Sequence, residues 1–344
     1  MKCLEDNTYN KAIFLYNYKK GGINMLFKNK SNEIRSGWKI LLVFLLTYGL
    51  SFIVSIILGI VLAIIGSVTG NTEYLLTGNI DSIINSELIF LVSVVLSNCV
   101  SIISCIIVWK WLDKKKIREM GVTSIKRGRN EFLVGLGVGA ITISIVAVGI
   151  ICFGNVEFVN PINKPNISLS LIYGLISFVF VGFGEEILSR GYIMSVLKQT
   201  RSKWVVLVGP ALIFAMLHLA NNGISVLAFI NLFLVGLLFA YMFMKSKNIW
   251  MPIGYHITWN YFQGYIWGFG VSGNDVQGLY KIKNVSDNII NGGAFGPEGG
   301  LMVTIIICLT FGFVYWYYKD ENIDNFMGIK IKEIIDLKST RNRW

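Results

Sequence analysis

The sequence predicts an all-α fold, a polytopic membrane bundle of about eight transmembrane helices. Hydrophobic residues fill 54% of the 344 positions, charged residues only 15%, and the mean hydropathy is +0.60. Soluble domains carry about a quarter charged residues, so most of this chain faces something other than water. The apolar residues also gather in runs near the length of about 20 residues that a helix needs to cross a bilayer. These runs lie roughly at 40–66, 88–109, 132–153, 168–184, 204–220, 223–244, 249–267 and 300–318.

The Lys and Arg residues between the runs indicate how the chain crosses the membrane. Residues 1–39 and 110–131 carry eight each, whereas 67–87 carry none and 154–167 carry one. Because basic residues gather on the cytoplasmic side, we expect a multi-pass plasma membrane protein with both termini in the cytoplasm. The irregular, glycine-rich loop 268–299 is then external. The net charge of +11 reflects this orientation, so the lipid bilayer is an expected partner and nucleic acid is not.

The two ends and the cysteines carry little further information. Met25 opens a plausible alternative start, so the first 24 residues could be a tail. Four of the five cysteines lie inside apolar runs and none has metal-ligand spacing, so we expect neither a disulfide framework nor a cysteine metal site.

Few ionisable residues lie within or directly beside the apolar runs, and such residues usually mark function. Each charged side chain at a helix centre costs roughly 2.5–3.5 kcal/mol on insertion scales. Glu185, Glu186 and Arg190 directly follow the run LIYGLISFVFVGFG. His218 closes the run VVLVGPALIFAML, and His256 lies in MPIGYHITWNYF. These are the chain's only two histidines.

Helical spacing separates the two glutamates. Glu186 and Arg190 are four residues apart and share a face, with the acid on the favourable N-terminal side, so we expect a structural ion pair. Glu185 points about 100° away from Glu186 and is free for another role. His256 and Asn260 are also four residues apart and share a face.

A second spacing connects Glu185 with His218. The two residues are equally distant along the chain from the turn at 201–202, so they would lie at the same height in a helical hairpin. We therefore expect Glu185 and His218 to approach one shared water, with His256 and Asn260 on its opposite side. Unpaired polar groups in lipid cost several kcal/mol, which favours one inward-facing cavity. We expect that cavity to open toward the cytoplasm, from which the span of His256 enters.

Three patterns together resemble a known family. Glu185, Glu186 and Arg190 fit Glu-Glu-x-x-x-Arg, Phe214 and His218 fit Phe-x-x-x-His, and His256 and Asn260 fit His-x-x-x-Asn. In this order, on separate spans, they resemble the CAAX-protease and bacteriocin-processing family of intramembrane endopeptidases, and its type II CAAX proteases in particular. The resemblance covers about residues 165–270.

The resemblance implies a glutamate-type endopeptidase that acts on a peptide or membrane-protein substrate without a cofactor. Glu185 would be the general base, assisted by His218, and His256 and Asn260 would stabilise the oxyanion. The chain then divides into a basic cytoplasmic tail, N-terminal helices, a catalytic core and a cytoplasmic tail. Their ranges are 1–39, 40–164, 165–318 and 319–344.

Other interpretations remain open. A glutamate and two histidines could hold zinc, although the HExxH pattern is missing and Asn is a poor zinc ligand. The fold could also serve as a non-catalytic immunity or chaperone-like protein, which would not need every motif residue. A proton-coupled transporter is a further alternative, but no internal repeat is visible. The substrate is not identified, and peptide processing or bacteriocin self-immunity is the favoured role.

Overall fold

The computed structural model describes residues 26–29, 31–70, 77, 86–321, 323 and 326–327. Its α-helices are α2 (Ser36–Val68), α4 (Ser86–Val108), α5 (Ile125–Phe153), α6 (Ser170–Glu186), α7 (Met194–Leu197), α8 (Lys203–Leu217), α9 (Val226–Ser246), α10 (Trp250–Tyr261) and α11 (Leu301–Tyr317). Three π-helical segments continue helices at Trp109–Asp113, Ile187–Ile193 and Phe262–Ile266. Short 3₁₀ turns lie at Ile117–Met120, Lys198–Thr200, Gly293–Phe295 and Pro297–Gly299. The strands are β1 (Val156–Phe158) and β2 (Ile282–Asn284).

The predicted all-α membrane bundle is confirmed, and every predicted apolar run coincides with a helix. Within the described residues, five helical stretches are long and apolar enough to span a membrane, and α8 and α11 are shorter apolar helices. The five stretches are Ser36–Val68, Glu87–Asp113, Ile117–Phe153, Ser170–Thr200 and Val226–Ser246. Large apolar side chains are exposed along these helices, as expected for a multi-pass protein that faces lipid. The count of eight crossings stays a prediction.

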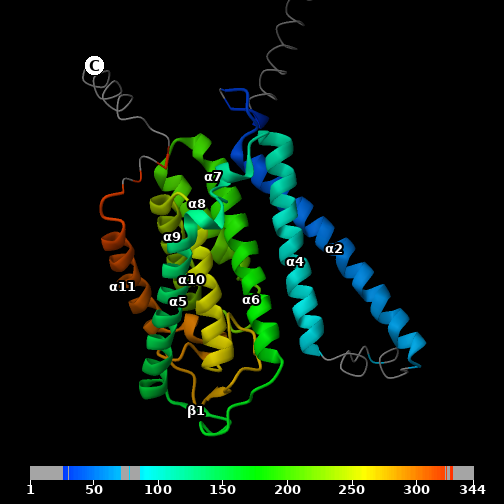
Figure 1. Cartoon of the computed structure of the whole chain (residues 1–344), viewed down its shortest axis with the longest axis vertical. Helices are drawn as coiled ribbons and strands as arrows, with labels where there is room; N and C mark the ends of the chain where they lie inside the picture. The colour runs from blue at the N-terminus through cyan, green and yellow to red at the C-terminus, as the bar shows by residue number, and fades with distance from the viewer. Residues whose placement is uncertain are drawn as a thin grey trace, which may run out of the picture.

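The helices run up and down, so the connecting loops collect at two ends of the bundle (Figure 1). Strands β1 and β2 pair antiparallel, with Glu157 opposite Lys283, and this joins the loop after α5 to the loop after α10. At the other end, Lys245 donates hydrogen bonds to the carbonyl oxygens of Tyr318 and Glu321, 3.1 Å and 2.5 Å away. Loops 154–167 and 268–299 therefore share one end, which we call the β end, and Lys245 lies at the other. Residues 1–25 and 328–344 lie outside the described residues.

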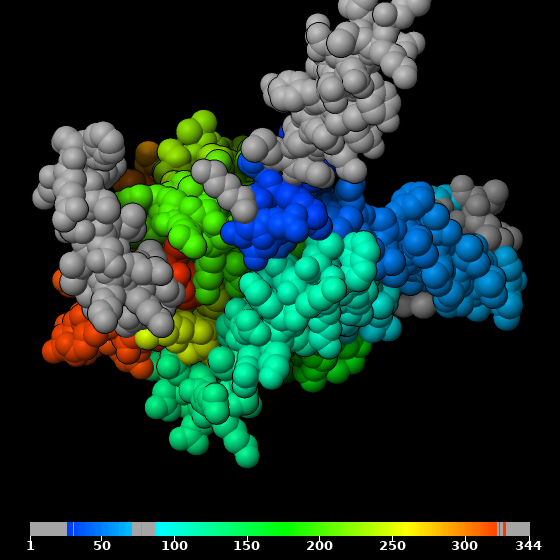
Figure 2. All heavy atoms as spheres, turned by 90° about the horizontal axis from the view of Figure 1, so that it is seen from above, coloured from blue at the N-terminus to red at the C-terminus, as the bar shows by residue number. Residues whose placement is uncertain are grey.

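Helix α2 lies at the edge of the bundle and projects sideways from it (Figures 1 and 2). It packs against α4 and α7 near its start, where the buried Lys39 forms an ion pair with Asp113. The Tyr192 hydroxyl also donates a hydrogen bond to the Lys39 carbonyl, at 3.1 Å. These contacts attach the start of α2 to the bundle at the end opposite β1 and β2.

Glycines bring α5 and α10 into close contact. A Cβ atom at Gly135 would lie 2.3 Å from the Met251 carbonyl oxygen, and one at Gly139 would lie 2.4 Å from the Tyr255 carbonyl oxygen. Gly254 of α10 likewise faces the α5 backbone. Small residues let helix backbones approach in membranes, where dispersion contacts replace the hydrophobic driving force. This packing sets the position of α10, which carries His256 and Asn260.

Candidate active site

Four side chains from three helices line one cavity of about 250 Å³. Glu185 lies on the last turn of α6, His218 immediately follows α8, and His256 and Asn260 project from α10. The rest of the wall is largely apolar, with Phe178, Leu232, Val235 and Phe239 among its residues. We call this hollow the site cavity. The structure therefore brings together the four residues that sequence analysis selected, and their chemical roles stay predictions.

Glu186 and Arg190 form an ion pair beside this cavity. The Arg190 Nη1 donates to Glu186 Oε1 at 2.9 Å, and both side chains are fully buried. The guanidinium also donates from Nη2 to the Gly236 carbonyl, 3.2 Å away, and lies between two aromatic rings. The ring centroids of Phe214 and Phe239 are 4.8 Å and 5.0 Å from it. Burial, paired charge and ring contacts make Arg190 a structural residue that holds α6, α8 and α9 together.

The helix changes from α to π geometry between the two residues of this pair. Helix α6 ends at Glu186, and Ile187–Ile193, which includes Arg190, is π-helical. We did not predict this π-helical segment from the sequence. A change from i to i+4 to i to i+5 hydrogen bonding does not alter the hydrophobicity of a run, so hydropathy cannot reveal it. Single π-turns often occur at functional sites. A second one, Phe262–Ile266, follows Asn260.

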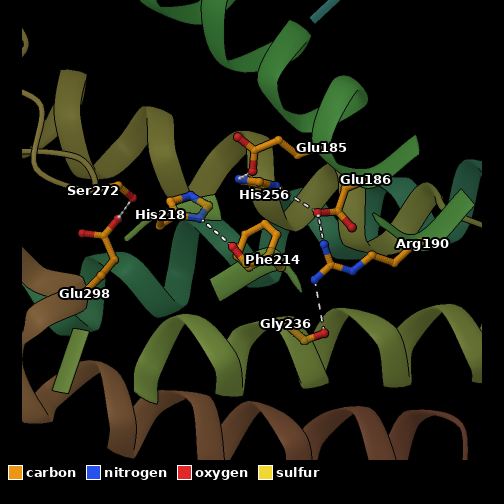
Figure 3. Close-up of polar contacts among 9 residues, drawn as sticks. All are labelled: Glu185, Glu186, Arg190, Phe214, His218, Gly236, His256, Ser272 and Glu298. Atoms are coloured by element: carbon orange, nitrogen blue, oxygen red, sulfur yellow. Dashed lines mark hydrogen bonds and ion pairs between the residues drawn. The ribbon is translucent and has the colours of Figure 1, made fainter. Parts of the chain in front are cut away.

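His256 is positioned by both glutamates (Figure 3). Its Nδ1 lies 3.1 Å from Glu186 Oε1, and its Nε2 lies 3.9 Å from Glu185 Oε2. Sequence analysis grouped His256 with Asn260 and missed both contacts, since 70 residues separate His256 from Glu186. No local spacing could have revealed this, because it depends on how α10 packs against α6.

His218 occupies a separate part of the cavity wall. Its Nδ1 lies 2.8 Å from the Phe214 carbonyl oxygen, which can only accept, so Nδ1 carries the proton and donates. Nε2 is then the free ring nitrogen. Among the described residues Glu185 forms its ion pair with His256 and has no direct contact with His218 (Figure 3). Whether one water joins Glu185 to His218 stays a prediction.

Glu185 and Asn260 keep free polar atoms in the site. The Glu185 side chain is 33% exposed, and its Oε2 has no hydrogen-bond partner among the described residues. Asn260 is only 8% exposed and its amide makes no hydrogen bond within the described part of the chain, although it lines the cavity. A free carboxylate and a free amide on one cavity can act as an acceptor and a donor toward a bound peptide.

Sequence analysis missed one acidic residue of the cavity wall, Glu298. Its Oε2 accepts from Gln263 Nε2 at 2.5 Å and its Oε1 accepts from the Ser272 hydroxyl at 3.1 Å (Figure 3). Burial raises the pKa of Glu298. On α9, Asn231 donates to the Glu298 and Gly300 carbonyls, which fixes this turn. The sequence showed Glu298 only as a charge in an irregular loop.

The lining of the site cavity includes residues from the loops between helices. Its wall includes Phe90 and Val94 from the start of α4, Asn221 from the turn after α8, and Ser272 and Glu298 from the loop after α10. All of these lie at or near the β end. The membrane face toward which the cavity opens stays a prediction.

No group of three or more His, Cys, Asp or Glu side chains that could hold a metal ion occurs in the part of the chain that the structure describes. His256 has both ring nitrogens near carboxylates, and the Nδ1 of His218 is taken by a carbonyl oxygen. The zinc alternative therefore has to be tested with a chelator.

A comparison with family models gives one match, over residues 167–262, to the family described as Rce1-like, type II CAAX prenyl endopeptidase. No curated protein and no solved structure matches the chain. The matched segment contains all three motifs and runs from just before α6 to the end of α10. Its family is one of proteases. Over residues 167–262, this chain is therefore similar to the type II CAAX prenyl endopeptidases, which supports the resemblance drawn from the three motifs.

Proposed function

We propose that the chain is an intramembrane endopeptidase that cleaves a peptide bond with a water activated by Glu185. The observation that carries this proposal is the convergence of Glu185, His218, His256 and Asn260 on one cavity. The match to a protease family supports the reaction class. Processing of a peptide or a membrane protein, including bacteriocin self-immunity, is the biological role that we propose.

The first step uses the free carboxylate of Glu185. This carboxylate takes a proton from water while the water oxygen adds to the scissile carbonyl carbon. The free Nε2 of His218 can accept the second hydrogen bond of that water and orient it.

The second step resolves the tetrahedral intermediate. Its oxyanion would receive hydrogen bonds from the Asn260 amide and from His256, which as an imidazolium donates from both ring nitrogens. Each such donor contributes roughly 3–4 kcal/mol in a dry site. Glu185 then passes its proton to the amine nitrogen as the carbon–nitrogen bond breaks. The products are a carboxylic acid and an amine, and the carboxylate of Glu185 is restored.

The experiment is a comparison of membrane peptides from cells that express the wild-type chain or Glu185→Gln. We expect uncleaved peptides to accumulate with the variant, and purified wild-type protein to cut them in a chelator-insensitive reaction. Asn260→Ala should lower kcat by about 10²–10³, the value of one oxyanion donor. Full cleavage by a folded Glu185→Gln protein would refute the proposal, and activity lost with a chelator would favour the zinc alternative.

A further inference from the structure

A second hollow adjoins the site cavity at the β end. It has a volume of about 360 Å³ and is lined by Glu87, Ser170, Tyr173, Ser177, Tyr265, Asp275 and Gln277, among others. We call it the vestibule. Phe90 and Val276 line both hollows, so the two adjoin each other. We refer to the two adjoining hollows together as the path.

Four acidic side chains line this path. Glu87 and Asp275 line the vestibule, and Glu185 and Glu298 line the site cavity. None of the described Lys or Arg side chains lines either hollow, although the whole chain has 31 of them against 20 acids. The protein is strongly basic, yet the side chains that line the two hollows include acids and no described Lys or Arg. Such a lining favours cationic ligands.

The vestibule also has an unpaired polar group. Ser177 of α6 is 2% exposed, and its hydroxyl has no hydrogen-bond partner among the described residues. A buried hydroxyl without a partner costs free energy that a ligand can recover. Together with the free Asn260 amide in the site cavity, it gives the path two polar groups suited to a peptide backbone.

Glu298 can pair with a cation in its ionised form, which a neighbouring cation stabilises. Each of its oxygens accepts one hydrogen bond, from Gln263 or from Ser272, and a carboxylate oxygen can accept two. The side chain is 7% exposed, so a cation beside it would be screened little by water. By contrast, Asp275 at the mouth is 89% exposed and lies 3.9 Å from Lys281 Nζ, so its own contribution is small.

We propose that the vestibule and the site cavity bind a basic segment of the polypeptide substrate, with Glu298 receiving a Lys or Arg side chain near the scissile bond. That the ligand is a polypeptide rests on the proposed function.

The test measures binding separately from cleavage. Full-length Glu185→Gln protein in detergent is titrated with a short fluorescent peptide that contains Lys, and with its twin in which Gln replaces Lys. We expect the Lys peptide to bind about tenfold more tightly, which corresponds to about 1.4 kcal/mol. Adding Glu298→Gln should remove most of this preference. Adding Asp275→Asn should lower it about twofold, with a difference that disappears at high salt.

Glu157→Gln is the matched control, since Glu157 is an exposed acid of β1 at the β end that lines neither hollow. It should keep the full preference. Equal binding of the two peptides, or a preference that survives both Glu298→Gln and Asp275→Asn, would overturn the inference. If wild-type protein cuts both peptides equally, the inference fails and the proposed function stands. If the Lys preference is present but nothing is cut, the proposed function fails alone.

Discussion

Replacing Glu186 by Gln should destabilise the protein strongly, because this carboxylate compensates a buried cation. One oxygen of Glu186 accepts from Arg190 at 2.9 Å and lies 3.1 Å from His256 Nδ1. The side chains of Glu186 and Arg190 have no exposed surface. Breaking a buried pair by removing one partner costs about 3–5 kcal/mol, since the other charge stays in a medium that cannot solvate it.

The measurement is the thermal midpoint of the full chain in detergent, followed by size-exclusion chromatography. At ~2 °C per kcal/mol, Glu186→Gln should lower the midpoint by about 6–10 °C. Glu185→Gln is the control, because the neighbouring carboxylate is 33% exposed and holds no guanidinium. Its midpoint should stay within about 2 °C of the parent.

A double variant separates stranded charge from lost packing. Arg190→Met removes the charge and still fills the space between Phe214 and Phe239. Added to Glu186→Gln, it should restore more than half of the lost stability, since a buried pair can be replaced by apolar residues at little cost. The reasoning is refuted if Glu186→Gln melts like the parent or if the two losses add. If Glu186→Gln folds but is inactive while Glu185→Gln stays active, the two carboxylates have been assigned the wrong way round.

Three further perturbations test the packing, the orientation and the buried acid. Gly139→Ala places a methyl group against the α10 backbone and should cost about 1–3 kcal/mol in thermal unfolding, whereas Gly137→Ala, with nothing within 4 Å, should be neutral or slightly stabilising. In a cysteine-free background, a membrane-impermeant thiol reagent on intact cells should label Lys283→Cys and not Lys115→Cys; the reverse would invert the predicted orientation. Burial raises the pKa of Glu298, so the folded protein keeps a proton that the unfolded chain releases above about pH 4.3. The free energy of unfolding therefore falls as pH rises toward the folded pKa. Glu298→Gln should then melt above the parent at alkaline pH and not at acid pH, and equal pH profiles would show that Glu298 does not titrate in this way.

Features of the site that depend on local spacing could be predicted from the sequence. Glu186 and Arg190 pair because residues four apart on a helical segment are neighbours whatever surrounds them. The division of roles between Glu185 and Glu186 has the same origin, since adjacent residues point in different directions. Ionisable residues beside apolar runs identified the site residues because lipid makes such residues expensive unless they face inward.

Features that depend on contact between distant segments could not be predicted. The partner of Glu185 is His256, because glycines of α5 and α10 set where α10 lies against α6. Glu298 reaches the cavity because Asn231 holds its turn, and that loop shows no periodic pattern.

The sequence by itself determined that this is a helical membrane protein. It also determined which ionisable residues lie beside apolar runs and which known family the chain resembles. Hydropathy and helical spacing are properties of neighbouring residues, and they survive without any knowledge of packing. The tertiary structure alone decided that His256 lies between two glutamates, that an acid from a loop completes the cavity wall, and that no described Lys or Arg lines either hollow. These are relations between segments brought together by close helix packing, and a one-dimensional pattern does not contain them.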